Sequence, residues 1–512
     1  MKRVAMVGLW ILLLAYLSAC TPNQIIRSTI AKSDRKDCNF KGTSDLTQFT
    51  SSNSADCSRY SIEDHEDYTL GFVEFDDQGW MYDRTQMDRL MKELDDQTQD
   101  GSDLSIFVYV HGWKHNAEFC DSNVCCFRET LKQMNALEGK YADVYKWNRR
   151  KIFGIYVGWR GLSTRGPDFL RSTSFYSRKN AATRVALGST RELLGKIKDF
   201  YERKNAPPGR QADRRNMQQM PLQNLKDAPR RRAGTRLLTM GHSFGGLVVY
   251  TAVAQALMES AIEPTQFAEQ QWVKPFGDLV LIVNPAFEGT RFEPLHQIAK
   301  HRLYPPNQPP VFVAVTSEGD QATGKAFPIG RWLNGVWEKY STGHVDGEID
   351  HTPEQQREAN VKTIGHTERY RTHRLEYRPS ARMAAINAAQ QDDAGSCTCP
   401  YRSGINDLLA NANIPAELEE WKTDYRANMV NGHRKPEWTR SYGADGTVLR
   451  HAPNDPNNGP DNPFWVVYAD KQIIADHNAF YTPLFLNFVR HTYDDSLHLW
   501  RLQQLPENVD RR

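Results

Sequence analysis

The sequence lacks an excess of charge of one sign. Its 512 residues include 64 Lys and Arg against 62 Asp and Glu, a formal net charge of +2. A nucleic-acid-binding protein needs a basic surface, so the overall charge gives no support for such a partner. Basic residues do cluster at 214–215 and 230–232, within a polar stretch at about 204–234. We interpret that stretch as a solvated loop.

The N-terminal apolar run is too short for a membrane span. It covers residues 4–17 and follows Lys2-Arg3, whereas a transmembrane helix needs about 20 apolar residues. This pattern predicts a signal peptide over 1–19. It ends in Leu-Ser-Ala-Cys20, which resembles the processing box of bacterial lipoproteins. The resemblance implies lipidation of Cys20 and, with Thr21 next, a location at the outer membrane facing the periplasm.

Cysteines are few, and their spacing matches no zinc site. We therefore expect no metal, and nothing in the sequence calls for an organic cofactor. Seven cysteines remain once Cys20 is set aside. In an oxidising compartment, proximity favours two disulfides: Cys38 with Cys57, and Cys120 with Cys125 or Cys126. Because seven is odd, one thiol stays free or pairs between chains.

From about residue 68, short apolar runs alternate with helical patterns. Continuous apolar runs are typical of a parallel sheet buried on both faces. The predicted fold is therefore a doubly wound, mostly parallel α/β sheet without repeats. The predicted strands are at 68–75, 104–110, 151–158, 236–240, 278–283, 311–316 and 464–469, and the predicted helices at about 82–97, 124–138, 180–202 and 245–259.

The remaining segments are polar. Residues 20–65 are rich in Ser, Thr, Asp and Asn, which predicts a membrane spacer before a core at 66–330. Residues 331–460 lack clear strands, and we interpret them as an insertion and a candidate cap, before residues 461–512 complete the core. The insertion contains an amphipathic helix at about 415–429, whose apolar stripe we assign to core packing.

The most informative motif is Gly-x-Ser-x-Gly at 241–245, centred on Ser243. An apolar strand precedes it and an apolar helix follows. A serine at such a corner sits in a strained turn with its hydroxyl pushed outward, as a nucleophile requires. Upstream, the strand at 104–110 runs into His111-Gly112-Trp113. The N–H groups of Trp113 and Phe244 are the expected oxyanion-hole donors. His115 and Asn116 follow, either lining the pocket or bracing this loop.

These strands and motifs together resemble the α/β-hydrolase superfamily, closest to bacterial envelope serine esterases and lipases. The resemblance covers about 68–330 and 460–495 and implies that acid and histidine follow the serine in that order. The acid is then expected just past the strand at 311–316, where Asp320 is our choice. Glu318 is an alternative, and Glu288, after the preceding strand, is another.

The chain has 15 histidines, so the base must be chosen by position. The family's histidine lies in the loop after the last strand, which makes His477 the expected base. His242, beside the nucleophile, is interpreted as a pocket or packing residue. The remaining candidates are assigned to the insertion surface or to the terminal helix: His344, His351, His366 and His373, and His491 and His498.

The sequence thus predicts a membrane-tethered serine hydrolase that cleaves carboxylic esters through Ser243, His477 and Asp320, with lipid esters as the variant that the membrane location suggests. Its expected partners are an acyl-ester substrate and the membrane, and the sequence identifies no protein partner. A peptidase, thioesterase or acyltransferase would use the same residues. A non-catalytic envelope protein retaining the fold is the other alternative.

Overall fold

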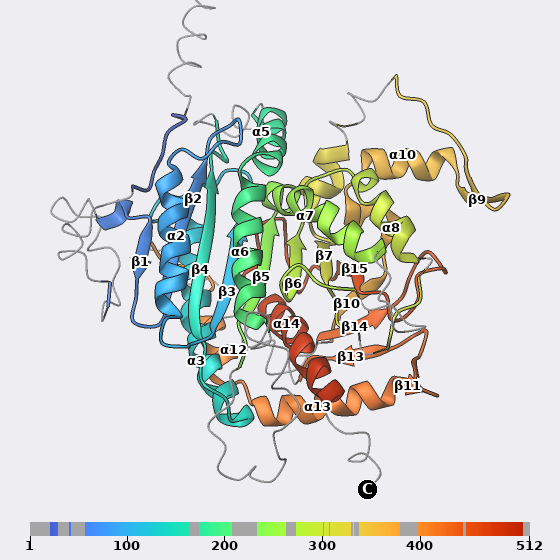
Figure 1. Cartoon of the computed structure of the whole chain (residues 1–512). Coiled ribbons are helices and arrows are strands. Elements are labelled where there is room, and N and C mark those ends of the chain that lie inside the picture. Colours follow the sequence, from blue (N-terminus) through green and yellow to red (C-terminus); the bar gives the residue numbers. More distant parts are fainter. Residues whose placement is uncertain are drawn as a thin grey trace, which may run out of the picture.

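The computed structural model describes residues 21–28, 40–41, 57–163, 174–206, 233–262, 273–300, 302–306, 308–328, 331, 337–378, 397–443 and 447–504. They form an α/β fold around a mixed sheet of 11 strands (Figure 1). The predicted α/β class, with a mostly parallel sheet, is confirmed. The predicted signal peptide, Cys20, Cys38 and the basic clusters at 214–215 and 230–232 lie outside the described residues.

The sheet has a parallel centre and antiparallel edges. Its order is β1-β2-β4-β3-β5-β6-β7-β15-β10-β14-β13. Neighbours from β2 to β10 are parallel, and β1, β14 and β13 pair antiparallel. The seven predicted strands are confirmed within two residues at each end. They are β2 (Thr69–Phe75), β3 (Leu104–Val110), β4 (Lys151–Trp159), β5 (Arg236–His242), β6 (Leu279–Val283), β7 (Phe312–Ser317) and β15 (Phe464–Ala469).

The chain reverses its direction across the sheet at β3. Strand β4 lies on one side of β3, and the next strand, β5, lies on the other. In open α/β sheets, ligands bind at the carboxyl ends of the strands beside such a switch point. The loops after β3 and β5 leave the sheet there. The topology therefore brings the loop at 111–113 beside Ser243.

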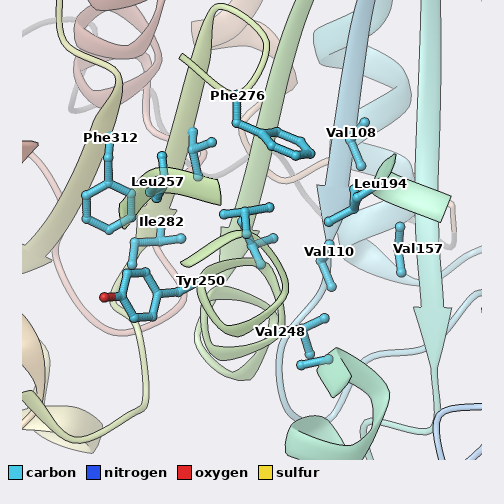
Figure 2. Packing of buried hydrophobic residues seen from close by; sticks show 14 of the residues in the cluster. Val108, Val110, Val157, Leu194, Val248, Tyr250, Leu257, Phe276, Ile282 and Phe312 are labelled. Carbon is cyan, nitrogen blue, oxygen red and sulfur yellow. The ribbon is translucent and has the colours of Figure 1, made fainter. Parts of the chain in front are cut away.

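Helices cover both faces of the sheet, and the strand residues alternate between them. On β3, Val108 and Val110 pack in one cluster, while Phe107 and Tyr109 pack in the other. Figure 2 shows Val108 and Val110 in the first cluster. This is the packing that continuous apolar strands predict, because both faces of each strand leave water.

Several predicted helices are longer or divided. The predicted helix at 180–202 is two helices, because the chain turns at Gly188, whose backbone lies against Gly79. The main helices are α2 (Arg84–Gln97), α3 (Ser122–Tyr145), α5 (Phe175–Leu187), α6 (Thr190–Asn205), α7 (Phe244–Ile262), α8 (Glu293–Lys300), α10 (Pro353–Val361), α12 (Arg402–Ala410), α13 (Ile414–Ala427) and α14 (Pro483–Gln504). By length and composition α7 could span a membrane, but its residues line the core beside the sheet.

The expectation that 331–460 lacks strands is wrong. This stretch extends the main sheet beyond β15 with β10 (His373–Tyr377), β14 (Thr447–His451) and β13 (Thr439–Ser441). It also forms hairpins from β8 (Gly343–Val345) with β9 (Glu348–His351), and from β11 (Met429–Val430) with β12 (His433–Arg434). Core packing of the stripe on α13 is confirmed for Trp421, which is buried.

The expected spacer at 20–65 is also wrong for the residues that are described. The Arg27 guanidinium is fully buried and pairs with Glu63 at 3.0 Å. The Glu74 carboxylate accepts hydrogen bonds from the Ile26 and Arg27 N–H groups at 3.0 and 2.7 Å. Residues 62–64 form the edge strand β1 (Ile62–Asp64). Buried charges are retained where they are paired, so residues 26–27 and 62–64 belong to the folded core.

The disulfide pattern differs from the predicted one. Cys120 pairs with Cys397 and Cys126 with Cys399, so the predicted pairing of Cys120 with Cys125 or Cys126 is wrong. Cys125 is buried and forms no disulfide. Cys57 is also disulfide-bonded, and its predicted pairing with Cys38 stays a prediction because Cys38 lies outside the described residues. The two bonds tie the start of α3 to the segment before α12.

Candidate active site

Ser243 occupies the corner between β5 and α7. Its φ of 56° lies in the left-handed region, which costs a non-glycine residue about 1–3 kcal/mol. Two backbone hydrogen bonds hold the corner: the Ser243 N–H donates to Val283 O at 3.0 Å, and Ser243 O accepts from the Ala286 N–H at 3.1 Å. A Cβ on Gly245 would lie 2.0 Å from Val110 O. Only glycine at 245 therefore lets α7 start this close to β3.

His477 lies opposite the serine, in the loop after β15. Its Nε2 is 2.8 Å from Ser243 Oγ, and its Nδ1 is 2.9 Å from Asp320 Oδ2. With the Nδ1 proton donated to the carboxylate, Nε2 carries the lone pair that accepts the serine proton. The structure therefore brings together the three residues that the sequence predicted.

Asp320 is buried behind the imidazole, in the turn after β7. Burial alone would raise the pKa of this carboxyl. The His477 ring, with its charge and its hydrogen bond, and the two hydrogen bonds from Thr323 outweigh burial and lower the pKa to about 2. The side chain is therefore ionised at neutral pH, as the partner of an imidazolium must be.

The two alternative acids have other partners. Glu288 is enclosed by cations: it pairs with Lys179, and Arg291 Nε and Arg331 Nε lie 3.4 and 3.5 Å from it. Glu318 accepts a hydrogen bond from the Lys471 N–H at 3.2 Å. Among the described contacts, neither carboxylate reaches His477.

The loop at 111–113 lies against the nucleophile. A Cβ on Gly112 would sit 2.8 Å from Ser243 Cβ and 2.9 Å from His242 O, so this contact requires glycine. Within the described loops, the N–H groups of Trp113 and Phe244 donate to no backbone carbonyl. They are thus available to a ligand beside Ser243.

His115 and Asn116 brace this loop. His115 Nδ1 is 3.1 Å from Asp121 Oδ1, and Asn116 Oδ1 accepts from the Glu118 N–H. Asp121 also caps the first turn of α3. Of the two sequence interpretations for these residues, bracing the loop is therefore the one their contacts support.

Two residues behind Asp320 are not among the predicted site residues: Thr323, and His366, which the sequence assigns to the surface. Thr323 donates its hydroxyl proton to Asp320 Oδ2, and its N–H donates to Oδ1 at 3.1 Å. His366 Nε2 lies 3.2 Å from Thr323 Oγ1 and is placed to donate to it. Burial lowers the pKa of His366 to about 4, which keeps the ring neutral. The signal for Thr323 was its position three residues past the acid, typical of a turn cap.

The backbone of the His477 loop is also fixed. His242 donates from Nε2 to His477 O at 2.7 Å, and Asn284 Nδ2 donates to the same carbonyl at 3.0 Å. The His242 ring stacks on Phe480 with centroids 4.2 Å apart. The predicted packing role of His242 is confirmed, and its specific partner is the base loop.

The expected surface location of the insertion histidines is partly wrong. His344 is exposed on β8, but His373 is buried against Trp465. His366 is half-buried behind Asp320. His491 and His498 are buried along α14, as the assignment to the terminal helix allows.

Aromatic rings surround the corner. Phe175, at the start of α5, packs edge-on against Trp113 at 5.4 Å and tilted against Phe244 at 4.9 Å. Phe327 closes the group at 6.4 Å from Phe175. Ser243 itself is only 2% exposed, and Phe175 packs against Trp113 and Phe244, the two expected oxyanion-hole residues of the site. Their apolar faces suit the hydrocarbon part of a substrate.

One cluster elsewhere resembles a metal site. Glu293, Asp350 and His351 offer ligand atoms within 4.8 Å of one another. Lys300 Nζ, however, lies 2.5 Å from Asp350 Oδ1, and Arg369 lies 3.5 Å from Oδ2. The Asp350 carboxylate is therefore already paired with two cations. The cluster is not part of the site at Ser243.

A comparison with known protein families finds no family model that matches the chain, and a comparison with curated proteins finds no similar sequence.

Proposed function

We propose that the protein is a serine hydrolase of the α/β-hydrolase type that cleaves carboxylic esters. One observation carries the proposal: the hydrogen-bonded series Asp320, His477, Ser243, with both imidazole nitrogens within 2.9 Å of their partners. A buried serine in a left-handed turn, next to a base that is itself oriented by a carboxylate, is the arrangement of an activated nucleophile.

In the proposed reaction, Ser243 Oγ attacks the acyl carbonyl carbon while its proton passes to His477 Nε2. Asp320 stabilises the imidazolium through the 2.9 Å hydrogen bond. The bond between the carbonyl carbon and the alcohol oxygen then breaks, and the proton on Nε2 passes to the leaving alcohol. Water, deprotonated by the same nitrogen, attacks the acyl-enzyme and releases the acid and the free serine.

The oxyanion of the tetrahedral intermediate would be stabilised by the N–H groups of Trp113 and Phe244. The close contact of Gly112 with Ser243 supports this role, because it sets the next N–H beside the nucleophile. Removal of one such donor costs a comparable enzyme about 10²–10³ in kcat.

The hydrolase type is supported by the order of the residues along the chain and sheet. Ser243 follows β5, Asp320 follows β7 and His477 follows β15, all at the carboxyl ends of parallel strands. The long segment between acid and base departs from a minimal hydrolase. Part of it extends the sheet, and part of it supplies His366 behind the acid.

The proposed location is the bacterial cell envelope, with a lipid on Cys20 as anchor. Disulfides persist in oxidising compartments, and those at Cys126–Cys399 and Cys120–Cys397 are consistent with export. Membrane attachment makes lipid esters a reasonable substrate class within the proposed activity.

A panel of p-nitrophenyl esters, with matched thioesters and anilides, tests the activity class. We expect ester hydrolysis that disappears in Ser243→Ala, with esters cleaved faster than anilides. Faster cleavage of anilides or thioesters would instead identify a peptidase or thioesterase. Equal rates for Ser243→Ala and the unchanged protein, or no turnover at all, would contradict the proposal.

A further inference from the structure

The chain is fixed to the fold from the first residue after Cys20. The Thr21 N–H donates to Ser163 O at 2.9 Å, and Arg160 Nη1 donates to Thr21 O at 2.8 Å. The hydrogen bonds from 26–27 to Glu74 continue this attachment. These contacts lie at the carboxyl ends of β4 and β2, toward the top of Figure 1.

The same segment after β4 also holds the loop beside Ser243. The Lys114 N–H donates to Gly161 O, and the Gly161 N–H donates to His115 O, both at 3.1 Å. Gly161 is two residues from Ser163, which binds Thr21. The start of the chain and the loop with the Trp113 N–H are therefore attached to one short stretch of backbone.

Two exposed apolar side chains lie at this edge of the sheet. Trp80, in the turn after β2, is 73% exposed. Leu187, at the end of α5, is 50% exposed and lies near Trp80, since the Ser189 N–H donates to Gly79 O at 2.8 Å. Exposed tryptophans are costly in water and favoured where a membrane meets water.

We propose that the edge carrying Trp80 and Leu187 faces the bilayer, and that Ser243 acts on acyl esters of lipids in that bilayer. This inference rests on the proposed hydrolase function and on lipidation of Cys20. The lipid that the motif ending in Cys20 implies, one residue before the docked Thr21, identifies a lipid surface as the occupant of this edge.

The attachment between Cys20 and the fold is short. One peptide unit, about 3.8 Å between Cα atoms, separates Cys20 from the docked Thr21. A flexible spacer over the 46 residues from 20 to 65 would instead have a root-mean-square length of about 35–40 Å. Such a spacer would let the site face any direction. The docked start holds the carboxyl edge of the sheet against the lipid.

Two fluorophore positions test the orientation without relying on catalysis. Leu187→Cys places a label at the proposed membrane edge. Leu303→Cys is the matched control, because Leu303 is also exposed, at 78%. It lies at the opposite edge of the sheet, since the neighbouring Arg302 donates to Ala261 O near the end of α7. Protein without an added cysteine measures background labelling of the buried Cys125.

The lipidated full chain is reconstituted in vesicles of phosphatidylethanolamine and phosphatidylglycerol, with and without brominated acyl chains. We expect bromine quenching and a blue shift for the label at 187, as for a group about 5–10 Å into the interface, and neither effect at 303. Quenching of both labels equally, of 303 alone, or of neither would overturn the orientation.

A second variant tests the short attachment. A flexible Gly-Ser linker of about 25 residues, spanning about 25–30 Å, is inserted after Cys20 with Thr as its first residue, which preserves the Cys-Thr junction. Hydrolysis of vesicle lipid should fall about tenfold or more, because effective concentration falls with linker length. Hydrolysis of a soluble short-chain ester should not change.

The outcomes separate the two proposals. If the unmodified protein does not hydrolyse the soluble ester, the proposed function fails, whatever the labels report. If it hydrolyses the ester but the linker variant cleaves vesicle lipid equally well, the function stands and the membrane-facing attachment is refuted.

Discussion

The choice of Asp320 as the acid can be tested against the other two carboxylates. Asp320→Asn, Glu288→Gln and Glu318→Gln each replace one carboxylate by an amide of nearly the same shape. Two quantities are measured for each variant: kcat/KM for a p-nitrophenyl ester per folded molecule, and the free energy of unfolding in urea.

Asp320→Asn should abolish most of the activity. It removes the acceptor 2.9 Å from His477 Nδ1, so the imidazole loses its orientation and the stabilisation of its cation. The same change in a serine protease lowers kcat about 10⁴-fold, which corresponds to about 5.5 kcal/mol. The unfolding free energy should fall by only about 2 kcal/mol, as judged from the lowering of the Asp320 pKa from 3.8 to about 2.

Glu288→Gln should show the opposite pattern. It leaves the buried Lys179 without a carboxylate partner, and breaking a buried pair costs about 3–5 kcal/mol. Its kcat/KM per folded molecule should stay close to that of the unchanged protein. Glu318→Gln, at a partly exposed site, should change the unfolding free energy by no more than about 0.5 kcal/mol. A 10⁴-fold loss in either glutamate variant, with Asp320→Asn active, would refute the assignment.

Four further outcomes follow from the same contacts. Thr323→Val should lower kcat/KM by about 10–100-fold, which corresponds to the free energy of one hydrogen bond to a charged group. Thr323→Ser keeps the hydroxyl and should restore kcat/KM. Equal rates in the Val and Ser variants would contradict a positioning role. Gly112→Ala should reduce both activity and stability, the latter by about 1–3 kcal/mol, because its Cβ would meet Ser243 Cβ at 2.8 Å; crystallography and urea unfolding check this. Replacing Cys126 and Cys399 together by Ala should lower the unfolding free energy by about 2–5 kcal/mol, measured against Cys125→Ala. The pKa of Asp320 in the folded protein is lowered to about 2. The stabilisation that the ionised carboxylate contributes should therefore be complete above about pH 4 and lost as the pH falls through about 2. Urea unfolding at several pH values should show this dependence, and Asp320→Asn should lack it.

The sequence predicts the centre of the sheet well because each central strand is buried on both faces. Runs such as Leu-Val-Leu-Ile-Val in β6 have no other low-energy location. The edge strands could not be predicted, because they lack such a continuous apolar run. Strand β10 reads His-Arg-Leu-Glu-Tyr, of which Leu375 packs in the core, and its pairing partners lie some 70–95 residues away along the chain.

The candidate site shows the same division. Ser243, Asp320 and His477 are predictable because each follows a strong strand in a known order. His366 is not, because its contact with Thr323 joins residues 43 positions apart through a polar segment. The disulfides join residues 273 and 277 positions apart, so the short spacing between Cys120 and Cys126 gave the wrong pairs. The polar composition of 20–65 also does not indicate that Arg27 is buried. Arg27 pairs with Glu63, and the composition does not reveal that contact.

The central claim is that Ser243 is an activated nucleophile. A fluorophosphonate probe, applied to the folded protein and followed by peptide mass spectrometry, measures this directly. We predict that the label lies on Ser243 with near-complete occupancy, is lost after urea denaturation, and forms far more slowly in His477→Ala. An unlabelled Ser243 in the folded protein, or undiminished labelling in His477→Ala, would contradict the account.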